Sequence, residues 1–229
     1  MKTYTNSWSK DELTNILKMS TMFMDFGGRQ FAKEMLPPFF PDMDIFRRFH
    51  MARVLKIPSW MKDTVTSLIR DIRLSQFRLE DCRELSDAFY VICITRDNID
   101  RHRRRIALVP GGATADPAPS CFNHQACIHT WDSVWLKRVT PYVLNPDRPN
   151  ALSSTEEFIR QLTFPSEMNV LCSIRMKELC LSVPSQPFHL EDAQIGDAAD
   201  EICRMFDMEK DIDEDWDKPV EVKLIPSEF

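Results

Sequence analysis

Cysteine and histidine are concentrated in one short run, CFNHQACIHTW at residues 121–131, and these side chains are the strongest candidates for chemistry in the chain. Thiolate sulfur and imidazole nitrogen are donors that Zn²⁺ prefers, so Cys121, His124, Cys127 and His129 could centre a small zinc-dependent or regulatory domain. The spacing C-x2-H-x2-C-x-H matches no common zinc motif, because structural sites usually take two ligand pairs from separated segments. On a helix, moreover, the last histidine would point away from the other three side chains.

A ligand from elsewhere could complete such a site, and Cys172 or Cys180 is a candidate for it. The competing interpretation makes the run the start of a helix just after a linker, and we favour that interpretation, so no metal ligand and no cofactor is predicted. A cysteine nucleophile paired with His124 or His129 is less well supported, because it would also need an orienting group and oxyanion donors. We assign no catalytic residue and predict that the protein is not an enzyme.

Charge and cysteine content restrict the class of protein further. The formal net charge is -6 and the pI is about 5.4, which argues against a general nucleic-acid binder because phosphate contacts require a positive field. Seven cysteines without a secretory signal favour a reducing compartment, so we expect a cytoplasmic or nuclear protein. The longest apolar run, AFYVICI, is too short to cross a bilayer, and no membrane association is predicted.

Two charged runs also have functional interpretations. RHRRR at residues 101–105 could be a nuclear-import or phosphate-binding patch, but we favour a solvated helix C-terminus, where cations complement the helix dipole. DIDEDWD at residues 211–217 alternates carboxylates like a calcium loop. Trp216 stands where that loop needs glycine and Val222 where it needs glutamate, so a solvated acidic tail is the better interpretation.

Five glycines in 229 residues and apolar side chains spaced by three and four predict an all-α fold, an irregular bundle of short antiparallel helices. Ser9 and Glu12 form a capping box that should begin the first helix, and the glycines at residues 27–28 should end it. Ser154 and Glu157 predict a second capping box.

Proline, glycine and charge divide the chain into expected domains. Residues 8–106 should form one helical region, and ALVPGGATADPAPS at residues 107–120 has the composition of a flexible linker. Residues 121–183 should form a small helical subdomain whose first helix breaks at Pro141. The remainder, residues 184–229, is strongly acidic and is expected to be a largely disordered tail.

Three segments of the first region resemble a known family. WSKDELTNILKMSTMFMDFGGRQFAKEML resembles the last two helices of a BTB/POZ domain of the fungal type, and DIFRRFHMARVLKIPSWMKDTVTSLI resembles the helical segment that follows that domain. LSQFRLEDCRELSDAFYVICITRDN is similar to the family's L-S-x-E-E-A-x-x-L-G helix pair, with Leu85 and Ser86 where the family has Leu-Gly. A position suited to glycine is therefore expected to be strained at this serine.

The resemblance implies a BACK-like, non-enzymatic protein-protein interaction module, a truncated adaptor whose partner and oligomeric state the residues do not name. A cullin-type ubiquitin ligase is one implied partner. The chain lacks the strand-rich first part of a BTB/POZ domain, which carries most of the dimer interface of the family and much of its cullin surface.

Overall fold

A computed structural model describes residues 8–72, 77–145, 150–182 and 188–208, and every regular element within these ranges is a helix. The predicted all-α class is confirmed. Contacts group the chain into two compact units, which are not the domains expected from composition. Unit 1 comprises Met1–Thr64, Arg78–Leu85 and Asp200–Phe229, and unit 2 comprises Val65–Phe77 and Ser86–Ala199.

Unit 1 begins with a helical hairpin of α1 (Lys10–Met22) and α2 (Phe26–Met35), which pack on each other. The predicted capping box begins α1, because the Ser9 hydroxyl accepts a hydrogen bond from the Glu12 amide and the Glu12 carboxylate accepts one from the Ser9 amide. The prediction that Gly27 and Gly28 end this helix is wrong, since both lie inside α2. Met24, with a φ of 55°, turns the chain before them.

The rest of unit 1 is a set of short helices and parts of two longer ones. It contains η1 (Pro37–Asp42), α3 (Ile45–Val54), the first part of α4 (Pro58–Arg70), α5 (Leu79–Leu85) and the last part of α11 (Leu190–Met205).

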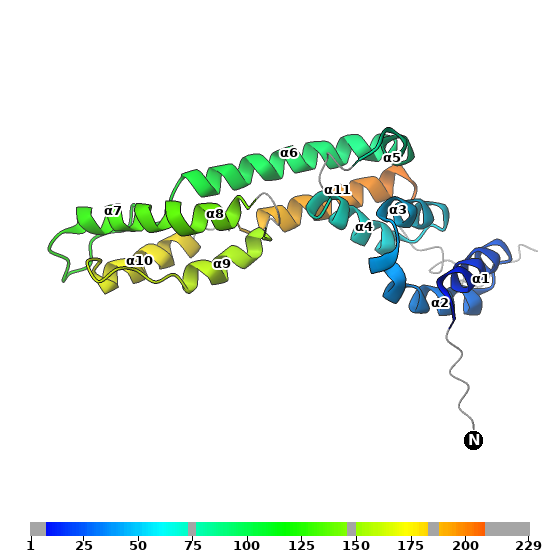
Figure 1. Cartoon of the computed structure of the whole chain (residues 1–229), viewed down its shortest axis with the longest axis horizontal. Helices are drawn as coiled ribbons and strands as arrows, with labels where there is room; N and C mark the ends of the chain where they lie inside the picture. The colour runs from blue at the N-terminus through cyan, green and yellow to red at the C-terminus, as the bar shows by residue number, and fades with distance from the viewer. Residues whose placement is uncertain (1–7, 73–76, 146–149, 183–187, 209–229) are drawn as a thin grey trace, which may run out of the picture. The chain divides into compact units, whose positions relative to one another are not determined.

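Unit 2 is built around the longest described helix, α6 (Asp87–Leu108). A nearly continuous helical rod runs alongside it, made of α7 (His124–Val134), the π-helical turn η3 (Trp135–Val139) and α8 (Thr140–Val143) (Figure 1). Two further helices, α9 (Leu152–Arg160) and α10 (Val170–Leu181), contact this rod and each other. The first part of α11 belongs to the same unit.

The rod passes through Pro141 without breaking, contrary to the sequence prediction. Proline lacks an amide hydrogen, and its ring would clash with the carbonyl of the residue four positions earlier in a regular α-helix. The π-helical turn of η3 directly precedes this position and widens the helix there. The helix then continues to Val143, whose side chain is buried.

Two tryptophans of the rod form the centre of the unit 2 core. Trp131 and Trp135 are 1% and 2% exposed, and their rings lie 5.9 Å apart. The Trp131 indole donates a hydrogen bond to the Gly111 carbonyl at 2.7 Å, and the Trp135 indole donates to the carbonyls of Ile106 and Ala107, both at 3.2 Å. The core thus satisfies its two polar indole groups with the backbone of the last turn of α6 and of the segment that follows it.

A buried ion pair joins α6 to α11 within unit 2. Arg103 donates from Nε to Glu191 at 3.0 Å and also donates to the carbonyls of Val143 and Asn150. Both partners are nearly inaccessible, with side-chain exposures of 7% and 1%. The basic run at residues 101–105 is therefore only partly a solvated patch, because its central arginine is a core residue.

The expected acidic tail is helical at its start. α11 occupies residues 190–205 and buries Ile195, Ala198 and Ile202, because apolar side chains spaced by three and four form one face among the acidic ones. The rest of that tail, including the DIDEDWD segment, lies outside the described residues.

Candidate metal centre

The candidate site lies where the start of α7 meets the start of α10. Asn123 caps α7 by accepting a hydrogen bond from the Ala126 amide at 3.2 Å, so His124 is the first residue of the helix and Cys127 follows one turn later. Cys121 precedes the helix in the turn that leads into it. Helical spacing places the side chains of His124 and Cys127 near one face of the α7 start, and the turn before the helix brings Cys121 beside them.

Cys172 reaches the site from α10. Asn169 caps that helix by accepting hydrogen bonds from the amides of Leu171 and Cys172 at 3.0 and 3.2 Å, which places the cysteine in the first turn. The Asn169 side chain also donates to the Ser120 carbonyl at 3.2 Å. One residue thus begins α10 and ties it to the segment that contains Cys121.

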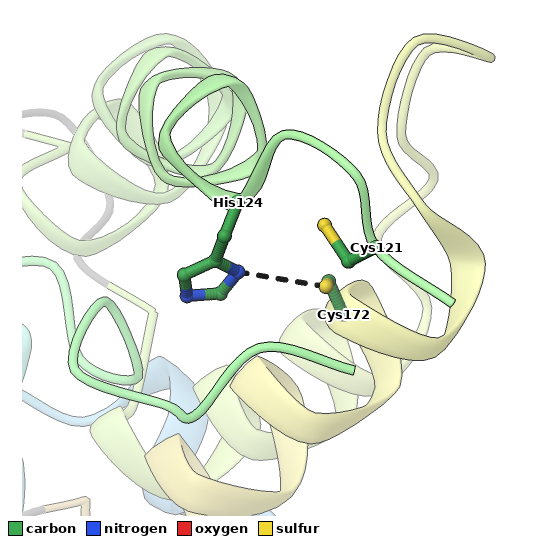
Figure 2. Close-up of side chains that lie close together, drawn as sticks. All are labelled: Cys121, His124 and Cys172. Atoms are coloured by element: carbon green, nitrogen blue, oxygen red, sulfur yellow. Dashed lines mark hydrogen bonds between the residues drawn. The ribbon is translucent and has the colours of Figure 1, made fainter. Parts of the chain in front are cut away.

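Three donor atoms, one each from Cys121, His124 and Cys172, lie within 4.8 Å of one another (Figure 2). The Cys172 sulfur is 3.6 Å from Nδ1 of His124. A fourth donor is adjacent, because the sulfurs of Cys121 and Cys127 are 3.7 Å apart. Cys127 and Cys172 are buried, whereas Cys121 and His124 are half-buried.

Backbone groups form hydrogen bonds that orient the candidate ligand side chains. Nε2 of His124 lies 2.9 Å from the Ala115 carbonyl, which can only accept, so the neutral ring carries its proton on Nε2 and leaves the Nδ1 lone pair directed at the cysteines. The Ala118 amide donates to the Cys172 sulfur at 3.4 Å, and the Asn169 amide donates to the Cys127 sulfur at the same distance. Outer hydrogen bonds of this kind fix ligand orientation and favour thiolate over thiol.

The cysteine thiols differ in acidity. Burial raises the pKa of Cys121, and hydrogen bonding to Cys172 and Cys127 raises it further, to about 11. Burial acts in the same direction on Cys172, but hydrogen bonds from the Ala118 amide, His124 and the two other thiols outweigh it, so its pKa lies below the usual 9.0. A cation bound by these sulfurs would favour their ionised form.

The segment expected as a flexible linker packs against this site. Gly112 is buried with a φ of 82°, and its Cα approaches the Met176 backbone of α10. Ala115 and Ala118 are also buried, and Arg175 donates to the Pro117 carbonyl at 2.8 Å. Small residues that suggest flexibility in the sequence are needed here because the loop lies directly on a helix.

The site differs from the sequence-predicted set in two positions. His129 is exposed on α7 and is not part of the cluster, because five residues of helix rotate its side chain away from that of His124. Cys180 is two turns beyond Cys172 on α10 and lies beside Gly111, where burial raises its pKa to about 12. Of the two distant cysteines considered from the sequence, Cys172 is the one that joins the cluster.

No protein-family model, no curated protein and no solved structure matches the chain. The resemblance to the helical region of fungal BTB/POZ proteins therefore stays a prediction. Within the described part of the chain, none of the helices has both the length and the apolar character required to cross a membrane.

Proposed function

We propose that unit 2 is a structural metal-binding domain in a protein without catalytic activity. The observation that carries this proposal is the convergence of Cys121, His124 and Cys172, whose donor atoms lie within 4.8 Å of one another although 48 residues separate the histidine from the last cysteine. Sulfur and imidazole donors favour Zn²⁺ over Mg²⁺ and Ca²⁺, which take oxygen ligands.

The metal would act as a crosslink. Cys121 and His124 enter from the segment around the start of α7, and Cys172 enters from α10, so one ion would join two chain segments that otherwise meet through side-chain packing and the Asn169 hydrogen bonds. Structural zinc contributes directly to folding stability, because the assembled ligands exist only in the folded chain. Unit 2 also has its own apolar core around Trp131 and Trp135, so the ion adds stability to a body that is already packed.

The test is metal content followed by chelator-dependent melting of the full chain. We expect about one zinc per chain, and at free zinc about 1,000-fold above the Kd a stabilisation of about 4 kcal/mol. For a chain of this length that corresponds to a fall in Tm of roughly 8–16 °C when a chelator removes the ion. A chain without zinc, whose melting a chelator leaves unchanged, would refute the proposal.

Cysteine variants supply the matched comparison. Cys172→Ser should abolish the chelator-dependent shift in Tm, because serine removes a soft ligand. Cys82→Ser should retain the shift, since Cys82 lies in α5 of unit 1 and is not part of the cluster. Equal behaviour of the two variants would show that the stabilising ion binds elsewhere.

A second candidate function, protein binding, is favoured by the apolar surface of the α1–α2 hairpin in unit 1. Six large apolar side chains there are 41–76% exposed, a concentration that usually marks an interaction surface, namely Met19, Met22, Phe23, Met24, Phe26 and Met35. Methionine suits such a surface because its flexible thioether adapts to a partner's shape. This is the protein-binding role that the BTB-like resemblance implies, for which we propose no named partner.

Two charge substitutions test this second function. A partner captured by the full chain should be lost with a Met22→Glu, Met24→Glu double variant. It should be kept with Leu108→Glu, which changes another exposed apolar side chain, in unit 2. Retention of every partner by the double variant would contradict the role of the hairpin.

A further inference from the structure

We propose that Cys127 is the fourth ligand of the metal centre, so that the site is a closed Cys3His zinc site formed by Cys121, His124, Cys127 and Cys172. This inference rests on the proposed metal-binding function and deepens it. It decides between two different kinds of zinc site, because four protein ligands make a structural site, whereas three ligands leave a position open for water or substrate.

Two of the distances between donor atoms match edges of a zinc tetrahedron. With Zn–S of about 2.3 Å and Zn–N of about 2.0–2.1 Å, the edge between two sulfurs is about 3.8 Å and the edge between sulfur and nitrogen is about 3.6 Å. The corresponding distances are 3.7 Å between the sulfurs of Cys121 and Cys127 and 3.6 Å between the Cys172 sulfur and Nδ1 of His124. Two opposite edges of the tetrahedron are therefore already near their ligated lengths.

The Cys127 thiol has polar partners that a space-filling core cysteine lacks. Its sulfur lies 3.7 Å from the Cys121 sulfur, and it accepts a hydrogen bond from the Asn169 amide at 3.4 Å. Cys180 provides the contrast within the same unit, since it is similarly buried and lies against Gly111. Cys127 is thus held toward the cluster by the same kind of amide donor that holds Cys172.

Charge balance is consistent with this ligand set. Three thiolates and one Zn²⁺ leave one net negative charge, which the amide donors of Ala118 and Asn169 partly offset. His124 contributes a neutral ligand, with its Nε2 proton bound to the Ala115 carbonyl. Cys172, His124 and Cys127 would therefore each be supported by a backbone hydrogen bond.

X-ray absorption at the zinc edge tests the inference on the unaltered full chain. We expect three sulfurs at about 2.3 Å and one nitrogen at about 2.0–2.1 Å. A first shell of two sulfurs with two or more nitrogen or oxygen atoms would overturn the inference and leave the metal-binding function in place. Failure of the chain to bind zinc at all would remove both.

Cobalt substitution of variants provides an independent measurement. Cys127→Ser should reduce the thiolate-to-cobalt absorption by about one third, because three thiolates become two, and should weaken zinc binding by more than the 10–100-fold expected for loss of an outer-shell partner. Cys180→Ser, the matched buried cysteine, should retain the absorption and the affinity. Unchanged absorption and affinity in Cys127→Ser would refute the assignment.

Discussion

Replacement of Gly112 by alanine tests whether residues 109–120 are a packed part of unit 2. This loop matters for the metal centre because its Ala115 and Ala118 backbone groups contact His124 and Cys172. Gly112 is buried with a φ of 82°. A Cβ at this position would lie 2.2 Å from the Met176 carbonyl oxygen and 2.9 Å from the carbonyl carbon. Both atoms belong to the backbone of α10, so no change of side-chain rotamer can relieve the contact.

The expected loss of stability combines two costs. A left-handed backbone conformation costs an L-residue about 1–2 kcal/mol, and displacing a close-packed backbone adds about 1–3 kcal/mol. We therefore expect Gly112→Ala to lower the free energy of unfolding by about 2–5 kcal/mol. Gly196→Ala is the control with the opposite sign, because Gly196 is exposed within α11 and a Cβ there meets nothing within 4 Å. Alanine should stabilise that helix by about 0.5–1 kcal/mol.

Urea unfolding followed by far-ultraviolet circular dichroism measures both changes. At a urea m-value of about 2 kcal/mol/M, the expected loss lowers the midpoint for Gly112→Ala by roughly 1–2.5 M. The midpoint for Gly196→Ala should rise slightly. Excess chelator in all samples removes any contribution from a bound ion. A midpoint for Gly112→Ala equal to that of the unaltered chain would refute the packed loop and restore the interpretation of residues 107–120 as a flexible linker.

Three further predictions concern the helices. Glu191→Ala should cost about 3–5 kcal/mol in urea unfolding, because it leaves Arg103 buried without its counterion; a loss below 1 kcal/mol would contradict the buried pair. Ser86→Gly should raise stability by about 1 kcal/mol, since the residue has a φ of 51°, and a lower midpoint would argue against backbone strain there. Hydrogen bonds from Ser9 lower the pKa of Glu12 from 4.5, so the capping box should stabilise α1 fully above pH 4.5 and lose this effect as the pH falls through the lower pKa of the folded state. An acid titration of helicity should detect the loss when Glu12→Gln is the control. Identical titrations of the two proteins would contradict it.

Features that depend on a few neighbouring residues were predictable from the sequence. The capping box of Ser9 and Glu12 begins α1 as expected, because each side chain bonds to the backbone only three residues away. The glycine-suited position at Ser86 does have a positive φ. The capping box expected at Ser154 is wrong, since α9 starts at Leu152 and the Ser154 hydroxyl bonds back to the Ala151 carbonyl. Leu152 is fully buried in the core, and α9 begins at this residue, two positions before Ser154.

The sequence by itself determined an all-helical chain and a run of zinc-binding residue types, because composition, helical spacing and caps are local properties. Only the tertiary structure decided which donors meet. Cys172 and Cys180 lie two turns apart on α10, so the sequence offers both as a fourth ligand. The packing of α10 against α7 brings Cys172 to His124, whereas Cys180 fills the core beside Gly111. In the same way, burial of Arg103 depends on Glu191, 88 residues away. Contacts at such separation arise from how apolar faces pack, which no short stretch of sequence encodes.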